Sequence, residues 1–299
     1  MFSHWFGILW RLMRPPTLTA SLTPVLVGTG LALQHTPLRT GLFIAMLVAA
    51  LLIQAAANMI NEYADFKRGL DTKEMVGISG TIVRDGVAPK TVLTIFFITI
   101  AISLLLGVYI AMSTSIWVAV TGILSMVFMY LYSSGPRPIS YTPFGEITAG
   151  VLMGPIIVLI SYFIQAGTLS ITAAVASIPI GLLIGAILLA NNIRDLEHDR
   201  PGGRKTLPVI LGRTRAITLL NSVFIISYLI LVILVITKTL TPFSLVALLA
   251  YPFSARIRSM FTQAKNSTQL QSAFKATSLT LIRFGFLLFI GLIVGASFK

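Results

Sequence analysis

Residues 58–71 read NMINEYADFKRGLD and close a long apolar run of the chain. A run of this kind crosses a bilayer with roughly 20 residues. Asn58, Asn61 and Asp65 stand at positions i, i+3 and i+7, so a helix that continues through them places the three side chains on one face. Gln54 extends this face by one turn toward the membrane interior. The stretch therefore predicts a membrane helix that ends in a polar, acidic face.

The same spacing returns in the second half of the chain, where residues 191–200 read NNIRDLEHDR. Asn192, Asp195 and Asp199 again stand at i, i+3 and i+7. Basic residues follow each copy, namely Lys67, Arg68 and Lys73 in the first and Arg200, Arg204 and Lys205 in the second. We therefore expect one domain over residues 1–299, with two pseudo-repeated halves that carry the motifs at 58–71 and 191–205.

The composition excludes an ordinary soluble domain, because 56% of the 299 residues are hydrophobic and only 10% are charged. The chain has no cysteine, which excludes a disulfide framework and a thiolate metal site. We expect an all-α membrane protein with nine transmembrane helices, the eighth short and either tilted or partly interfacial. The expected spans are Leu18–Leu33, Thr40–Ala57, Thr91–Met112, Ser115–Tyr132, Ile147–Ile164, Ile171–Ala190, Ala216–Ile236, Pro242–Phe253 and Thr277–Ser297.

The net charge of +13 does not indicate a nucleic-acid partner, because the basic residues lie in the loops between spans. With the N-terminus inside, only Arg39, Lys238 and Lys299 fall on the outer side, and Arg283 falls inside the last span. Cytoplasmic loops of membrane proteins carry such an excess of Lys and Arg. The charge distribution therefore predicts that the N-terminus and both motifs lie on the inner side.

The chain has nine acidic residues, none before Glu62 and none after Asp199. Two facing helices with carboxylate and amide oxygens offer the ligands that Mg²⁺ prefers, and Mg²⁺ commonly binds substrate phosphates as well. We therefore expect Mg²⁺ and a diphosphate, here that of a lipid. Asn58 and Asn192 could instead join helices in the bilayer. A cation or solute transporter is a remote alternative, because its site usually lies near the bilayer midplane.

Five stretches resemble the UbiA superfamily of intramembrane prenyltransferases, and the resemblance covers essentially the whole chain. They are RPPTLTASLTPVLVGT (14–29), NEYADFKRGLDT (61–72), GTIVRDG (80–86), YSSGPRPISYTPFGE (132–146) and NNIRDLEHDRPGGRKTLP (191–208). Within the superfamily the chain is most similar to the branch that prenylates 1,4-dihydroxy-2-naphthoate in menaquinone biosynthesis. The superfamily's first motif commonly reads Asn-Asp-x-x-Asp-x-x-x-Asp. Here Glu62 holds the second position and Asp71 comes two residues late, which leaves their ligand roles open.

The resemblance implies nine helices around a central cavity in a bacterial cytoplasmic membrane, with the two motifs facing each other. It implies transfer of a polyprenyl group from polyprenyl diphosphate to 1,4-dihydroxy-2-naphthoate, with loss of diphosphate and CO₂. The alternative is a prenyltransferase of the same superfamily that acts on another acceptor, namely 4-hydroxybenzoate, homogentisate or haem. The implied metal ligands are Asn61, Asp65, Asp71, Asp195 and Asp199. The expected catalytic residues are Asp65, Asp195, Asp199 and Lys205. The expected substrate-binding residues are Asn58, Lys67, Arg68, Tyr132, Arg137, Asn192 and Arg204. Among these, Arg137 is assigned to the naphthoate carboxylate.

Overall fold

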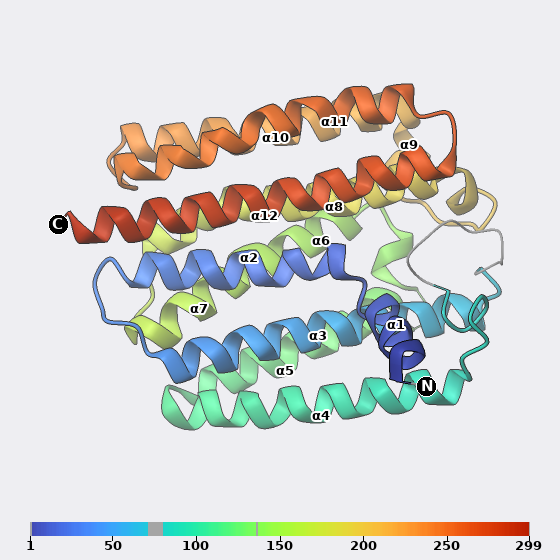
Figure 1. The fold of residues 1–299 in the computed structure, drawn as a ribbon, viewed down its shortest axis with the longest axis horizontal. Coiled ribbons are helices and arrows are strands. Elements are labelled where there is room, and N and C mark those ends of the chain that lie inside the picture. The colour runs from blue at the N-terminus through green and yellow to red at the C-terminus, as the bar shows by residue number, and fades with distance from the viewer. Residues whose placement is uncertain (1, 71–79, 136, 299) are drawn as a thin grey trace.

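The computed structural model describes residues 2–70, 80–135 and 137–298, and these form helices joined by turns, with no strand among them (Figure 1). The elements, in chain order, are α1 (Phe2–Met13), α2 (Pro15–Ala32), α3 (Thr40–Lys67), α4 (Pro89–Ser113), α5 (Ile116–Ser133), a 3₁₀-helix η1 (Ile139–Tyr141), α6 (Gly145–Val151), a π-helix η2 (Leu152–Ile156), α7 (Ile157–Ala166), α8 (Ile171–Asp199), α9 (Leu207–Leu211), α10 (Arg213–Ile236), a 3₁₀-helix η3 (Pro242–Ala250), α11 (Tyr251–Gln263) and α12 (Ser267–Ser297).

Seven helical segments of the described chain are long and apolar enough to cross a membrane. They are α3, α4, α5, the continuous segment Gly145–Ala166, α8, α10 and α12. The first expected span does form a helix, α2, but its four threonines and three prolines make it less apolar than the other spans. The eighth expected span, Pro242–Phe253, is divided between η3 and α11. The all-helical prediction is thus confirmed, whereas two of the nine expected spans are not among the seven.

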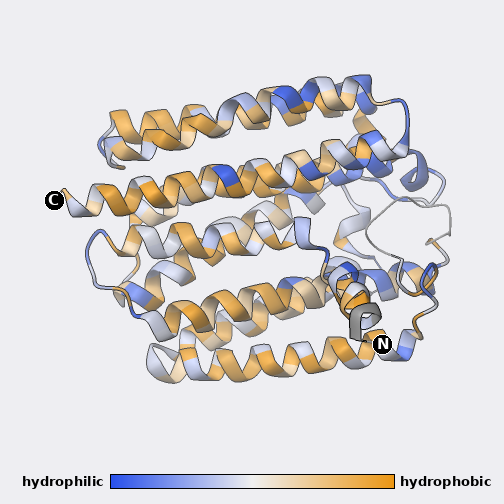
Figure 2. Ribbon diagram, in the orientation of Figure 1, coloured by the Kyte–Doolittle hydropathy of each residue, from blue (hydrophilic) through white to orange (hydrophobic). Residues whose placement is uncertain are grey.

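The long helices lie side by side in a bundle, and α8 packs against α2, α6, α10 and α12 (Figure 1). Hydrophobic residues cover most of the bundle, and hydrophilic residues gather at the end where α3 and α8 finish (Figure 2). Helix α1 lies across this end and buries Ile8 and Leu12 against residues of α3 and α4. The fold therefore places the polar ends of α3 and α8 at one end of an apolar bundle.

Close helix packing holds the start of α6 against the end of α8. A Cβ atom at Gly154 of η2 would lie 2.4 Å from the Cα of Gly181, and one at Gly185 would lie 3.2 Å from the backbone oxygen of Glu146, so the backbones touch along this line. Small residues allow this approach between membrane helices. Pro155 has no N–H for the helix ladder, and the chain passes it in the π-helical turn η2. The contact brings Glu146, at the start of α6, beside Asn192 near the end of α8.

Both motifs lie on uninterrupted helices, as their spacing predicts. Helix α3 runs through the first motif to Lys67, and α8 runs through the second to Asp199. Gly69 has a φ of 68° just beyond α3, the left-handed conformation with which glycine commonly ends a helix. Asp71 and Lys73 lie outside the described residues.

Candidate active site

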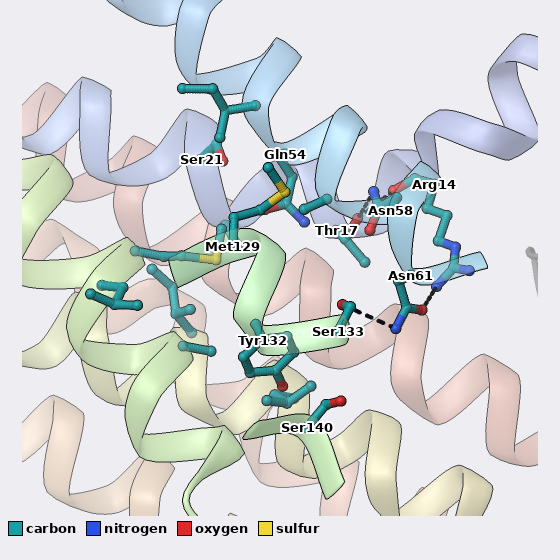
Figure 3. A pocket seen from close by; sticks show the side chains of 18 of the residues that line it. Arg14, Thr17, Ser21, Gln54, Asn58, Asn61, Met129, Tyr132, Ser133 and Ser140 are labelled. Atoms are coloured by element: carbon teal, nitrogen blue, oxygen red, sulfur yellow. Dashed lines mark hydrogen bonds between the residues drawn. The ribbon is translucent and has the colours of Figure 1, made fainter. Parts of the chain in front are cut away.

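A cavity of about 400 Å³ opens between the ends of α3 and α8 and reaches into the bundle. Its polar end is lined by both motifs and three arginines: Asn58, Asn61, Asp65, Asn191, Asn192, Asp195, Asp199, Arg14, Arg194 and Arg204. Its deeper wall is largely apolar and includes Met46, Ile53, Ile110, Val118, Met126, Met129, Leu152, Ile157, Ile160 and Ile184. Figure 3 shows part of this wall, with Gln54, Met129 and Tyr132 beside the polar residues. The cavity thus joins a charged mouth to an apolar chamber.

Arg204 connects the two motifs across the mouth of the cavity. Its Nη2 lies 2.6 Å from Asp65 Oδ1, and its Nη1 lies 3.3 Å from Asp199 Oδ1. The guanidinium also lies 4.7 Å from the ring centre of Tyr141. Burial disfavours the charged guanidinium, but Asp65, Asp199 and Tyr141 outweigh burial and raise the pKa of Arg204 above its usual value. Carboxylates from both halves therefore stabilise one positive charge at this place.

Asp195 lies on the same helix face but pairs with its neighbour in the chain. Arg194 donates to both carboxylate oxygens of Asp195, with Nε–Oδ1 at 2.7 Å and Nη2–Oδ2 at 2.6 Å. The same guanidinium donates to Asn191 Oδ1 and to Gln271 Oε1 of α12. It also lies 4.8 Å from the ring centre of Phe274. These contacts fix Asp195 and Arg194 as a rigid pair in the cavity wall.

The two asparagines that begin the motifs are held in the same way. Asn58 donates its Nδ2 to Met13 O and Thr17 Oγ1, both at 2.8 Å. Asn192 donates its Nδ2 to Glu146 Oε1, also at 2.8 Å. Because an amide has one nitrogen and one oxygen, these bonds leave each Oδ1 available as an acceptor. Residues outside the motifs therefore set the orientation of both amides.

Asn61 sits between Arg14 and Ser133 (Figure 3). Arg14 Nη1 donates to Asn61 Oδ1 at 3.2 Å, and Asn61 Nδ2 donates to Ser133 Oγ at 3.4 Å. Arg14 is the residue before α2 and has a φ of 49°, which is uncommon for a residue with a Cβ. This backbone turn lets Arg14 reach the end of α3 from a different helix.

Glu62, whose role the sequence left open, is fully buried and does not line the cavity. Its Oε1 accepts hydrogen bonds from Thr81 Oγ1 and from the backbone N–H of Ile82. Its Oε2 lies 3.9 Å from Arg14 Nη2. Glu62 therefore joins α3 to the loop that precedes α4 and to the start of α2, which is a structural arrangement.

Four of the expected basic residues lie away from the cavity wall. Lys67, Lys205 and Arg137 are exposed, and Lys67 lies 6.0 Å from the ring centre of Tyr63. Arg68 is also exposed and donates to the backbone oxygens of Ser133 and Gly135. The roles assigned to these four side chains in phosphate or carboxylate binding stay predictions.

The sequence did not single out Arg14 and Arg194 as binding residues, although both line the cavity. The signal for Arg194 was its place inside the second motif, between Asn192 and Asp195. The signal for Arg14 was weaker, since only its position before Pro15 and Pro16 marks it as the start of a helix. Tyr141 is a further addition, because its ring lies against both Arg204 and Arg68.

The oxygen ligands of the site suit Mg²⁺ chemically. Asp199 Oδ2 is buried and has no hydrogen-bond partner in the part of the chain that the structure describes, so it remains available as an acceptor. Within that part, no three His, Asp or Glu side chains are grouped so that they could hold a metal ion by themselves. The expected ligand Asp71 lies outside it. The donor set therefore fits a hard cation whose remaining ligands come from water or phosphate.

Comparison with known proteins agrees with this arrangement. Residues 21–292 match the model of the UbiA prenyltransferase family. The chain is 49% identical to the 1,4-dihydroxy-2-naphthoate octaprenyltransferase of Bacillus subtilis over 96% of this chain and 92% of that protein. It is 28% identical to the enzyme of the same name from Mycobacterium tuberculosis over 90% of this chain and 91% of the other.

A solved structure has the same fold. It is a UbiA homologue from Archaeoglobus fulgidus bound to GPP and Mg²⁺, with a TM-score of 0.67, 20% sequence identity, and coverage of 94% of this chain and 99% of that one. Together with the family match over most of the chain, this likeness accounts for the helical bundle. The chain therefore belongs to the UbiA prenyltransferase family and is a prenyltransferase.

Proposed function

We propose that this enzyme transfers a polyprenyl group from polyprenyl diphosphate to 1,4-dihydroxy-2-naphthoate, releasing diphosphate and CO₂ to give demethylmenaquinone in its reduced, hydroquinone form. The observation that carries the proposal is the cavity, which joins two aspartate motifs to an apolar chamber. A diphosphate and a polyprenyl chain need these two environments side by side. The names of the relatives from Bacillus subtilis and Mycobacterium tuberculosis support the choice of acceptor.

We assign the diphosphate to the polar end of the cavity. Mg²⁺ would be held there by Asn61, Asp65, Asp71, Asp195 and Asp199. When bound, this ion would neutralise the charge that develops on the leaving diphosphate. The Archaeoglobus fulgidus homologue, bound to GPP and Mg²⁺, supports the presence of this ion.

Arginines at the cavity mouth would bind the phosphate oxygens that the metal leaves free. Arg14, Arg194 and Arg204 already line the polar end, and arginine binds phosphate through two parallel hydrogen bonds. Lys67, Arg68 and Lys205 lie near the same end of the bundle and would add to its positive field. Electrostatic stabilisation of this kind is usually the largest single contribution to catalysis.

The apolar wall would protect the reaction from water. The bond between the prenyl carbon and the diphosphate oxygen breaks, and its electron pair stays with the diphosphate. The ring of the acceptor supplies the pair for the new carbon–carbon bond, and departure of the carboxylate as CO₂ returns a pair to the ring. Met46, Met129 and Ile157 are among the side chains that exclude water from the allylic cation. Tyr132, at the inner edge of this wall, would contact the substrate (Figure 3).

We also propose the topology that the charge distribution predicts. In this arrangement nine helical segments cross the cytoplasmic membrane of a bacterium, with α2 and the η3–α11 segment added to the seven apolar spans. The N-terminus and the cavity mouth face the cytoplasm, and the two halves are pseudo-repeats. The excess of Lys and Arg at the end of the bundle that carries the motifs supports this orientation.

The test uses the purified protein in detergent with Mg²⁺ and a polyprenyl diphosphate. Parallel reactions contain 1,4-dihydroxy-2-naphthoate or 4-hydroxybenzoate, each with and without EDTA. We expect a prenylated naphthohydroquinone, which oxygen of the air then oxidises to the naphthoquinone, together with CO₂, only with the naphthoate and only without EDTA. Product from the benzoate alone would refute the acceptor, and turnover that survives complete chelation would refute the role of the metal.

A further inference from the structure

Arg283 is a charged residue on an apolar, exposed face of helix α12. Leu279, Arg283, Phe286 and Ile290 follow one another at intervals of four, three and four residues, so they share one face. Leu279, Phe286 and Ile290 are exposed side chains, and Phe286 is 52% exposed. This helix is one of the seven apolar spans. Arg283 is therefore placed on a surface that meets lipid, where an isolated charge is costly.

The guanidinium of Arg283 lies over the face of Phe253, with its Cζ 4.0 Å from the ring centre. Stacking of this kind uses the face of the guanidinium and leaves the N–H donors at its edge free. In the part of the chain that the structure describes, no side chain or backbone oxygen accepts a hydrogen bond from them. No acidic residue occurs anywhere after Asp199. Among the residues that the structure describes, Arg283 therefore has no carboxylate partner, which leaves its charge available to an external anion.

Arg256 is a second arginine without a carboxylate partner among the described residues, and it lies one turn beyond Phe253 on helix α11. Phe253 and Arg256 are three residues apart and thus share a face of α11. Arg256 is exposed, and its side chain has no carboxylate partner among the described residues. Arg256 lies closer than Phe253 to the end of α11, where Arg213 of α10 donates to the backbone oxygens of Phe261 and Ala264. Arg256 thus shares a helix face with Phe253, the residue on which Arg283 stacks, and lies one turn closer to the end of the bundle that holds the motifs.

We propose that Arg283 and Arg256 bind the phosphate group of an anionic phospholipid at the outer surface where α11 packs against α12. Arginine suits a phosphate, because its planar donors match two phosphate oxygens at once. The acyl chains of the lipid pack along Phe286 and Ile290, which lie farther than Arg283 from the end of the bundle that holds the motifs. This site lies on the outer surface of the bundle and does not involve the residues that line the cavity. It is independent of the proposed reaction.

Phosphatidylglycerol is the probe for this site. The full chain in detergent is titrated with it, and bound lipid is counted by native mass spectrometry. We expect Arg283→Gln and Arg256→Gln each to weaken binding about tenfold, the loss that one charge-assisted hydrogen bond predicts. Arg258→Gln is the matched control, because Arg258 is exposed on α11 but lies two residues from Arg256 and so points to another side. This control should bind as the wild type does.

Two further arms identify the ligand. The wild type should bind phosphatidylcholine more weakly than phosphatidylglycerol. Arg283→Gln and Arg256→Gln should each bind the two lipids with equal affinity. Inorganic phosphate should not compete. Competition by inorganic phosphate would overturn the lipid assignment, and so would wild-type affinity in Arg283→Gln or an equal loss in Arg258→Gln. Circular dichroism checks that each variant is folded. Should Arg283→Gln fail to fold, Arg256→Gln and Arg283→Lys test the same site, and Arg283→Lys should lose part of the affinity.

Discussion

Arg204 Nη2 lies 2.6 Å from Asp65 Oδ1, although 139 residues separate them in the chain. The same guanidinium reaches Asp199, so one cation holds a carboxylate of each motif. The side chains of Asp65, Asp199 and Arg204 are all less than one fifth exposed. The contact therefore fixes the distance between the ends of α3 and α8 and sets the charge at the mouth of the cavity.

Replacing Arg204 by glutamine should lower kcat/KM by about 100-fold or more, the usual effect of removing one charge-stabilising group. The amide cannot neutralise Asp65 and Asp199, which then repel each other, and it cannot stabilise the leaving diphosphate. Arg200→Gln is the control, because Arg200 is exposed in the same loop. It should keep wild-type turnover. Similar losses in both variants would show that the general charge of the loop matters rather than the contact with Asp65.

Asp195→Asn should lower turnover by a similar factor and raise the Mg²⁺ concentration needed for half-maximal rate. The reason is the loss of a carboxylate oxygen from the cavity wall, where a hard cation requires oxygen ligands. Glu197→Gln removes an acid two residues away that is exposed and does not line the cavity. Its Mg²⁺ dependence should match the wild type. An unchanged Mg²⁺ dependence in Asp195→Asn would remove Asp195 from the ligand set.

The spacing of each motif was enough to predict which side chains share a helix face, because helical periodicity is a local property. It could not predict Arg14 in the site, since that residue reaches Asn61 only through a left-handed backbone turn and the packing of α2 on α3. The eighth expected span is helical but changes from a 3₁₀-helix to an α-helix within its length, a change that its apolar composition does not reveal. Pro242 and Pro252 each stand in the first turn of a helix, so the apolar run contains two helix starts.

Glu62 should be needed for stability but not for metal binding. Glu62→Ala leaves Thr81 and the N–H of Ile82 without their buried acceptor, which costs about 1–3 kcal/mol for each such group. Thermal unfolding in detergent measures the loss. Thr81→Ala removes the same hydrogen bond from the other side, so the two effects should be less than additive in the double variant. Glu62→Gln should keep the wild-type Mg²⁺ dependence, and a large rise in the Mg²⁺ requirement would make Glu62 a ligand.

The length of prenyl chain that the enzyme accepts should depend on Gly122. This residue lines the cavity from α5, and a Cβ there would meet no atom within 4 Å. It stands 11 residues before Ser133, which bonds Asn61 at the polar end, so it lies about 16 Å deeper along the helix.

Gly122→Phe would fill this depth with an aromatic ring. We expect kcat/KM to fall about tenfold or more for a long polyprenyl diphosphate and much less for farnesyl diphosphate, because the pocket then rejects chains by size. Val120→Phe is the control, since Val120 is exposed on the same helix and does not line the cavity. In this control, the ratio of kcat/KM for the long polyprenyl diphosphate to kcat/KM for farnesyl diphosphate should match that of the wild type. An unchanged ratio in Gly122→Phe would mean that the prenyl chain does not run along α5.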